Sequence, residues 1–109
     1  MKSSNEMFNK VFEEIIVPVI NRMTEADYKK MLEGKSTLCI NEADFKNFYG
    51  AFLQRTKLFY FRQFTKYKNE GREKFFPESI EQVERDIHFL YVEFKSFLKE
   101  QRSKMKSGE

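Results

Sequence analysis

The sequence predicts an all-α fold, a small helical bundle in which two shorter N-terminal helices pack on a long antiparallel helical hairpin. Two observations lead to this prediction. Apolar side chains recur every three or four positions through most of the 109 residues, and this is the period of one face of a helix. The chain also has only 4 Gly and 2 Pro, which are too few to supply the turns of a small β-sandwich or barrel.

The composition is typical of one folded domain, and we expect residues 1–109 to form it, because domains of about 100 residues are common. The 13 Phe and 5 Tyr argue against a disordered chain. The only cysteine, Cys39, lies between apolar neighbours and has no disulfide partner, so we expect it to be buried. The sequence shows neither a signal peptide nor an apolar run long enough for a membrane span. We therefore expect a cytoplasmic protein.

The first helix is predicted to begin near Ser4. Ser3 and Glu6 have the spacing of a capping box, and apolar residues at helical spacing follow directly. Pro18 has no N–H to donate to the previous turn. We expect the helix to continue through a kink at this residue and to end near Met23.

A second, short helix is predicted over residues 25–33. Thr24 and Asp27 repeat the capping pattern of the first helix. Gly34 stands where a left-handed C-terminal cap belongs. These signals predict a break in the chain just before Thr24.

The third helix is predicted over residues 42–69. Asn41 and Asp44 form another N-terminal cap, and Gly71 follows the last turn. Between these limits the Phe and Tyr side chains fall within a sector of roughly 160° around a helix axis. The helical period therefore outweighs the local preference of these aromatic residues for strands.

The fourth helix is predicted to begin near Pro77, which suits a first helical turn, and Ser79 with Gln82 offers an alternative cap. The apolar residues that follow have the alternating spacing of a coiled-coil seam; they are Ile80, Val83, Ile87, Leu90, Phe94 and Phe97. The tail from Arg102 onward is expected to fray.

The connection over residues 70–77 is short, so the third and fourth helices are expected to form an antiparallel hairpin. A turn near Lys74 predicts three charge pairs between them. These are Arg55 with Glu93, Arg62 with Asp86, and Lys66 with Glu81 or its neighbour Gln82. At the other end of the hairpin, the basic segment 95–106 is expected to meet Glu42 and Asp44.

The basic residues also indicate an alternative function. Residues 55–74 hold seven basic and two acidic residues, a net charge of +5, with aromatic residues between them. This composition suits contacts with phosphates and stacking on bases. The residues that would carry nucleic-acid binding are Lys57, Lys68, Arg72, Lys74, Lys104 and Lys106. The charge pairs of the hairpin are the competing explanation for these basic residues.

No pattern in the sequence indicates catalysis. His88 is the only histidine, and neither a second His nor a Cys lies at the spacing of metal ligands. No Gly-rich phosphate loop, nucleophile elbow or zinc-protease motif is present. We therefore expect no enzyme activity, no cofactor, no metal and no small-molecule substrate.

Four large apolar residues lie off the helical seams, and they are Leu58, Phe61, Phe89 and Val92. Each would lose about 1.5 to 3 kcal/mol of favourable burial free energy if it stayed in water, so something should cover these side chains. The N-terminal helices are one candidate, and a partner protein or a second copy of the chain is the other. The sequence thus predicts a protein-interaction module of the adaptor or inhibitor type. A composition rich in Lys, Asn and Phe with only three Ala is typical of AT-rich genomes, such as those of phages, which would place the protein in the host cytoplasm.

Overall fold

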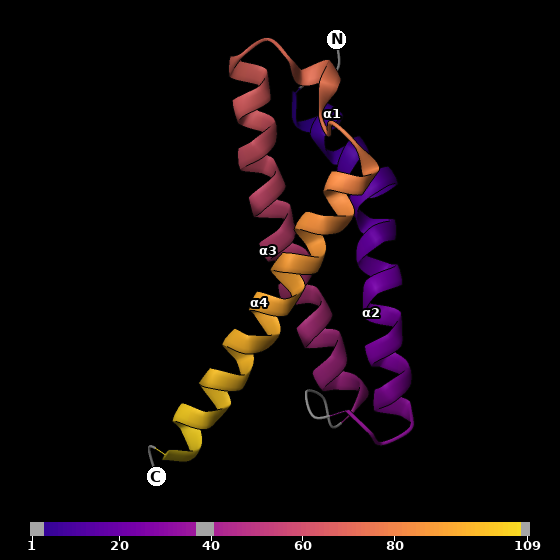
Figure 1. Ribbon diagram of the computed structural model, residues 1–109, viewed down its shortest axis with the longest axis vertical. Coiled ribbons are helices and arrows are strands. Elements are labelled where there is room, and N and C mark those ends of the chain that lie inside the picture. Colours follow the sequence, from indigo (N-terminus) through magenta and orange to yellow (C-terminus); the bar gives the residue numbers. More distant parts are fainter. Residues whose placement is uncertain (1–3, 37–40, 108–109) are drawn as a thin grey trace.

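The structure, a computed structural model, describes residues 4–36 and 41–107. All regular elements among them are helical (Figure 1): α1 (Ser4–Val11), the π-helical turn η1 (Phe12–Ile16), α2 (Val17–Leu32), α3 (Glu42–Asn69), the 3₁₀ turn η2 (Glu73–Phe75) and α4 (Ile80–Ser107). The predicted all-α class and small bundle are confirmed. None of the helices in these residues is long and apolar enough to cross a membrane.

Two N-terminal helices are present, but the boundary between them differs from the prediction. It lies at η1, where the Val17 N–H donates to the carbonyl of Phe12, five residues earlier. This wider turn comes directly before Pro18, where the hydrogen-bond ladder loses a donor. The break predicted before Thr24 is wrong, because α2 continues through this residue. Its hydroxyl donates to the Ile20 carbonyl at 3.0 Å instead of capping a new helix.

The ends of α3 lie where the sequence predicts them. The Asn41 side chain accepts a 2.9 Å hydrogen bond from the Asp44 N–H, which satisfies a donor of the first turn. At the other end, Gly71 adopts a φ of 69°, and the Arg72 N–H donates to the Tyr67 carbonyl at 2.7 Å. This is the Schellman motif, which requires a residue that tolerates positive φ.

Helices α3 and α4 run antiparallel, but they cross at an angle rather than lying side by side along their length (Figure 1). The buried residues of α3 recur every fourth position: Phe48, Phe52, Thr56, Tyr60 and Phe64. A stripe with this spacing winds around the helix and favours a crossing of roughly 50°. The ring of Phe52 lies 5.1 Å from Tyr91 and 5.7 Å from Phe94, whereas the predicted register placed it opposite Ser96. The coiled-coil seam is therefore not formed along its full length.

The connection between α3 and α4 fills the space where the two helices diverge. Phe76 is buried there, with its ring 5.5 Å from both Phe64 and Tyr67. Ser79 caps α4 as predicted, since its hydroxyl accepts a 3.1 Å hydrogen bond from the Gln82 N–H. Helix α4 continues to Ser107, so it includes most of the tail, for which fraying stays a prediction.

The charge pairs predicted between α3 and α4 are not formed. The guanidinium of Arg55 lies 5.7 Å from the ring centroids of both Phe94 and Phe97 rather than beside a carboxylate. Glu42 pairs with Lys46 of its own helix at 3.4 Å. These pairs fail because the helices diverge on both sides of their crossing point (Figure 1).

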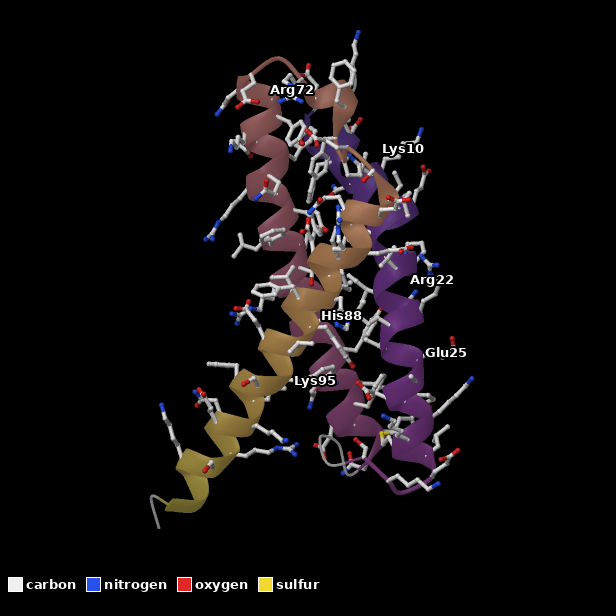
Figure 2. All side chains as sticks on the ribbon, viewed as in Figure 1. Lys10, Arg22, Glu25, Arg72, His88 and Lys95 are labelled. Atoms are coloured by element: carbon white, nitrogen blue, oxygen red, sulfur yellow. The ribbon has the colours of Figure 1, made fainter. Side chains whose placement is uncertain are left out.

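The ion pairs between distant segments instead join α2 to α4. Arg22 lies 3.3 Å from Glu84, and Lys95 lies 3.5 Å from Asp27. Figure 2 shows Arg22 on α2 and Lys95 on α4. The N-terminal helices therefore hold α4 in place, a role that the sequence analysis had assigned to α3.

Candidate functional site

The four predicted interaction residues remain exposed to solvent in the structure. The exposed fractions are 53% for Leu58, 41% for Phe61, 63% for Phe89 and 49% for Val92. The N-terminal helices therefore do not cover the whole set. The residues belong to two separate helices, with Leu58 and Phe61 on α3 and the other two on α4.

Leu58 and Phe61 form part of a groove between α1 and α3, which we call the α1–α3 groove. Its volume is about 440 Å³, and it is lined by Phe8, Asn9, Gln54, Lys57, Leu58 and Phe61. The four α3 residues come from successive turns, so they share one face of the helix. The groove thus combines an apolar floor with polar edges on both helices.

The floor of the groove rests on the hydrophobic core. The Phe61 ring lies 5.2 Å from the Phe8 ring at an angle of 85°, an edge-to-face contact that aromatic pairs favour. Phe8 is only 2% exposed, and it also contacts Phe64 at 5.7 Å. This chain of contacts fixes Phe61 while leaving one side of its ring open to solvent.

Phe8 and Asn9 were not among the predicted site residues. Both lie on α1, where Phe8 belongs to the apolar residues at helical spacing that follow the predicted cap, and it is buried in the core. Their place in the groove depends on where α1 docks against α3. No local sequence signal reports that docking position.

Two basic residues flank the groove. The Lys57 ammonium lies 5.7 Å from the Phe12 ring centroid, so it lies beside η1, directly after α1. Lys68 is exposed and lies seven residues beyond Phe61, close to the same face of α3. Neither lysine takes part in an ion pair between described residues. Lys57 therefore leaves positive charge in the groove, and Lys68 leaves it on the same side of α3, two turns beyond Phe61.

The second apolar surface lies on the outer side of α4. The inner side of this helix carries the buried residues Val83, Ile87, Tyr91 and Phe94. Phe89 and Val92 point away from that side, because the helical period places them on the opposite face. We call this surface the outer face of α4.

The residues predicted for nucleic-acid binding do not gather into one patch. The Arg72 guanidinium pairs with Glu70 at 3.4 Å and with Glu78 at 3.3 Å, and it lies over the Tyr67 ring. The C-terminal end of α4, which carries Lys104, lies at the opposite end of the molecule from Arg72 (Figures 1 and 2).

The other basic residues of that set add little to a common surface. Lys74 is exposed in the connection between α3 and α4. The side chain of Lys106 lies outside the described residues. The structure therefore disperses these charges over both ends of the molecule.

The candidates for catalysis stay isolated as well. His88 is exposed in a shallow hollow with Glu81, Glu84 and Arg85. Within residues 4–36 and 41–107, no group of three or more His, Cys, Asp or Glu side chains could hold a metal ion. Cys39 lies outside the described residues. Among the described residues, burial and the nearby Asp86 carboxylate raise the pKa of Tyr60 well above its ordinary value.

The geometry therefore offers apolar surfaces for binding and, in the described part of the chain, no assembled catalytic centre. The α1–α3 groove combines the two features of a docking site, namely exposed apolar side chains and a rigid support. Comparisons of the chain with protein-family models, with curated proteins and with solved structures find no match.

Proposed function

We propose that this protein is a non-catalytic helical interaction module of the adaptor or inhibitor type, which binds another protein through the α1–α3 groove. One observation supports the proposal above all. Leu58 and Phe61 are 53% and 41% exposed in a groove of about 440 Å³ between two helices. Apolar anchors held on rigid elements are the usual energetic centres of protein interfaces.

The partner segment that fits best is an amphipathic helix. A groove between two helices accepts the apolar face of a third helix, with side chains on successive turns entering it. The floor formed by Phe8, Leu58 and Phe61 would receive those side chains. Lys57 and Lys68 favour acidic residues along one edge of the partner helix, because complementary charge steers association.

Photo-crosslinking in cells that produce the protein tests this proposal. We would place p-benzoylphenylalanine at position 58, in the groove, and separately at position 32. Leu32 is the matched control, since it is 66% exposed at the end of α2, outside the groove. We expect the probe at position 58 to form adducts with another protein. The probe at position 32 should form none of these adducts.

The adduct then allows a binding measurement with the purified partner. Leu58→Asp should weaken binding by about tenfold or more, because it places a carboxylate on the apolar floor. Leu32→Asp should leave the affinity within about twofold, since exposed sites away from an interface contribute little. Equal adducts from positions 58 and 32, or equal affinities of the two aspartate variants, would contradict the proposal.

A further inference from the structure

The outer face of α4 carries a complete second stripe of exposed residues. The stripe has alternating spacings of four and three, and its members are Arg85, Phe89, Val92, Ser96, Lys99 and Ser103. All six are exposed, with Phe89 and Val92 at its centre. Helix α4 crosses in front of α3 in Figure 1, so none of the described elements lies over this side. Alternating spacing of four and three is the pattern of a seam between two helices.

The charges of α4 are divided between its two halves. Residues 80–93 hold four acidic residues and one basic residue, a net charge of −3. Residues 94–107 hold five basic residues and one acidic residue, a net charge of +4. The basic half diverges from α3 (Figure 1), so it does not meet the acidic start of α3 as expected. Its charge is best matched by the acidic half of another α4.

We propose that a second copy of this chain covers the outer face of α4, and that the two α4 helices pair antiparallel about a twofold axis. In this arrangement Phe89 of each copy packs on Val92 of the other. Glu81 then comes beside Lys99 of the second copy, and the acidic half of each helix faces the basic half of the other. Parallel pairing in register would set like charges against each other. The twofold axis closes the assembly as a dimer.

The pairing also brings two carboxylates together, Asp86 of one copy and Glu93 of the other. Arg85 lies in the seam between these positions and offsets the repulsion. Its guanidinium donates a 2.9 Å hydrogen bond to the Gln82 side chain, which in turn donates to Asp86 at 2.8 Å. The twofold axis repeats this carboxylate pair, and each of the two pairs has an Arg85 next to it.

This inference does not depend on the α1–α3 groove, so either surface could fail without the other. Sedimentation equilibrium on the purified chain tests it first. We expect a dimer at concentrations on the order of 100 µM. Phe89→Ser should raise the dissociation constant of the dimer by about tenfold or more, since it removes a central aromatic contact from both halves of the interface.

Phe75→Ser is the matched control, because Phe75 has the same exposed fraction as Phe89, 63%, but lies in η2. It should leave the dissociation constant unchanged. Helicity measured by circular dichroism should be the same for both variants and the wild type. A wild-type chain that stays monomeric, or a Phe89→Ser chain that dimerises as well as Phe75→Ser, would overturn the inference.

A charge exchange tests the antiparallel direction. Glu81→Lys and Lys99→Glu should each weaken the dimer by about fivefold to tenfold at low salt, because each change turns two attractive contacts into repulsive ones. The double variant Glu81→Lys with Lys99→Glu should restore dimerisation. Failure of this restoration would overturn the antiparallel pairing, while the groove proposal would keep its own separate test.

Discussion

The Tyr91 hydroxyl donates a 2.5 Å hydrogen bond to the Oδ2 atom of Asp27, joining α4 to α2. The Lys95 ammonium lies 3.5 Å from the same oxygen and 4.9 Å from the centroid of the Tyr91 ring. The Asp27 side chain is only 18% exposed. One carboxylate therefore binds two successive turns of α4 and fixes the crossing helix on the N-terminal segment.

Asp27→Ala is expected to lower the free energy of unfolding by about 1.5 to 3 kcal/mol, because hydrogen bonds to a charged group are among the stronger ones. Urea unfolding followed by circular dichroism measures this loss. The control is Glu84→Ala, which removes the exposed ion pair with Arg22. It should cost less than about 1 kcal/mol. Equal losses in the two variants would contradict the role assigned to Asp27.

Thr56→Val is expected to raise the free energy of unfolding by about 1 kcal/mol. Thr56 is fully buried at the centre of α3, and its hydroxyl has no hydrogen-bond partner among the described residues. Valine has nearly the same shape and removes the buried hydroxyl without leaving a cavity. The same urea unfolding measurement applies.

Thr24→Val is the matched control for this change. Thr24 is also buried, but its hydroxyl donates to the carbonyls of Ile20 at 3.0 Å and Asn21 at 3.2 Å. Removing these hydrogen bonds should lower stability by about 1 kcal/mol. A loss of stability in Thr56→Val would show that the Thr56 hydroxyl finds a partner.

The sequence predicts those parts of the fold that depend on local signals. The bounds of α3 follow from the Asn41 cap and from Gly71, whose positive φ ends the helix. Ser79 caps α4 by the same local chemistry. Each of these signals acts within four residues, so it can be recognised without knowledge of the tertiary structure.

The failures of prediction involve residues whose partners are distant in the sequence. Thr24 and Asp27 match a capping box, yet the Asp27 carboxylate binds Tyr91, 64 residues away. The register of α3 on α4 was also missed, because the crossing angle depends on how the whole core packs. The off-seam position of Leu58 could be predicted from the helical period, but the sequence left open whether the N-terminal helices cover it. The α1–α3 groove could not be predicted, since it requires the docked position of Phe8.

Tyr60 should make the stability of the protein sensitive to alkaline pH. Burial and the Asp86 carboxylate raise the pKa of its hydroxyl, so the folded protein keeps this proton when the unfolded chain releases it. The contribution of protonated Tyr60 to the free energy of unfolding is therefore fully present below about pH 10, the ordinary pKa of tyrosine. It is lost as pH rises above this value. For one proton that only the folded protein keeps, the free energy of unfolding falls by about 1.4 kcal/mol per pH unit.

Tyr60→Phe is expected to reduce this dependence, as measured by urea unfolding at several pH values between about 9 and 11.5. It should not abolish the dependence, because burial raises the pKa of Tyr49 and a hydrogen bond with Glu78 raises that of Tyr67. At neutral pH the change should cost about 1 kcal/mol, since it removes the long 3.4 Å hydrogen bond to the Val83 carbonyl and the interaction with Asp86. An unchanged slope above pH 10 would contradict the assignment.

Nucleic-acid binding by this protein is expected to be weak and to disappear as salt approaches physiological concentration. The positive charge of Arg72 is already matched by Glu70 and Glu78. Lys57 and Lys104 lie on different helices, α3 and α4, and the C-terminal end of α4 diverges from α3 (Figure 1). Few simultaneous phosphate contacts give a low affinity overall, so even a modest rise in salt is enough to remove the binding.

Titration of fluorescent single-stranded DNA and RNA at two salt concentrations measures this binding. Arg72→Gln should leave the weak affinity unchanged, because its guanidinium is held by two carboxylates. Lys68→Gln is the comparison, since Lys68 is exposed and has no ion pair among the described residues. Tight binding that survives physiological salt and is lost in Arg72→Gln would show that the loop opens its ion pairs to bind phosphate. In that case the basic stretch of residues 55–74, rather than the α1–α3 groove, would be the functional surface.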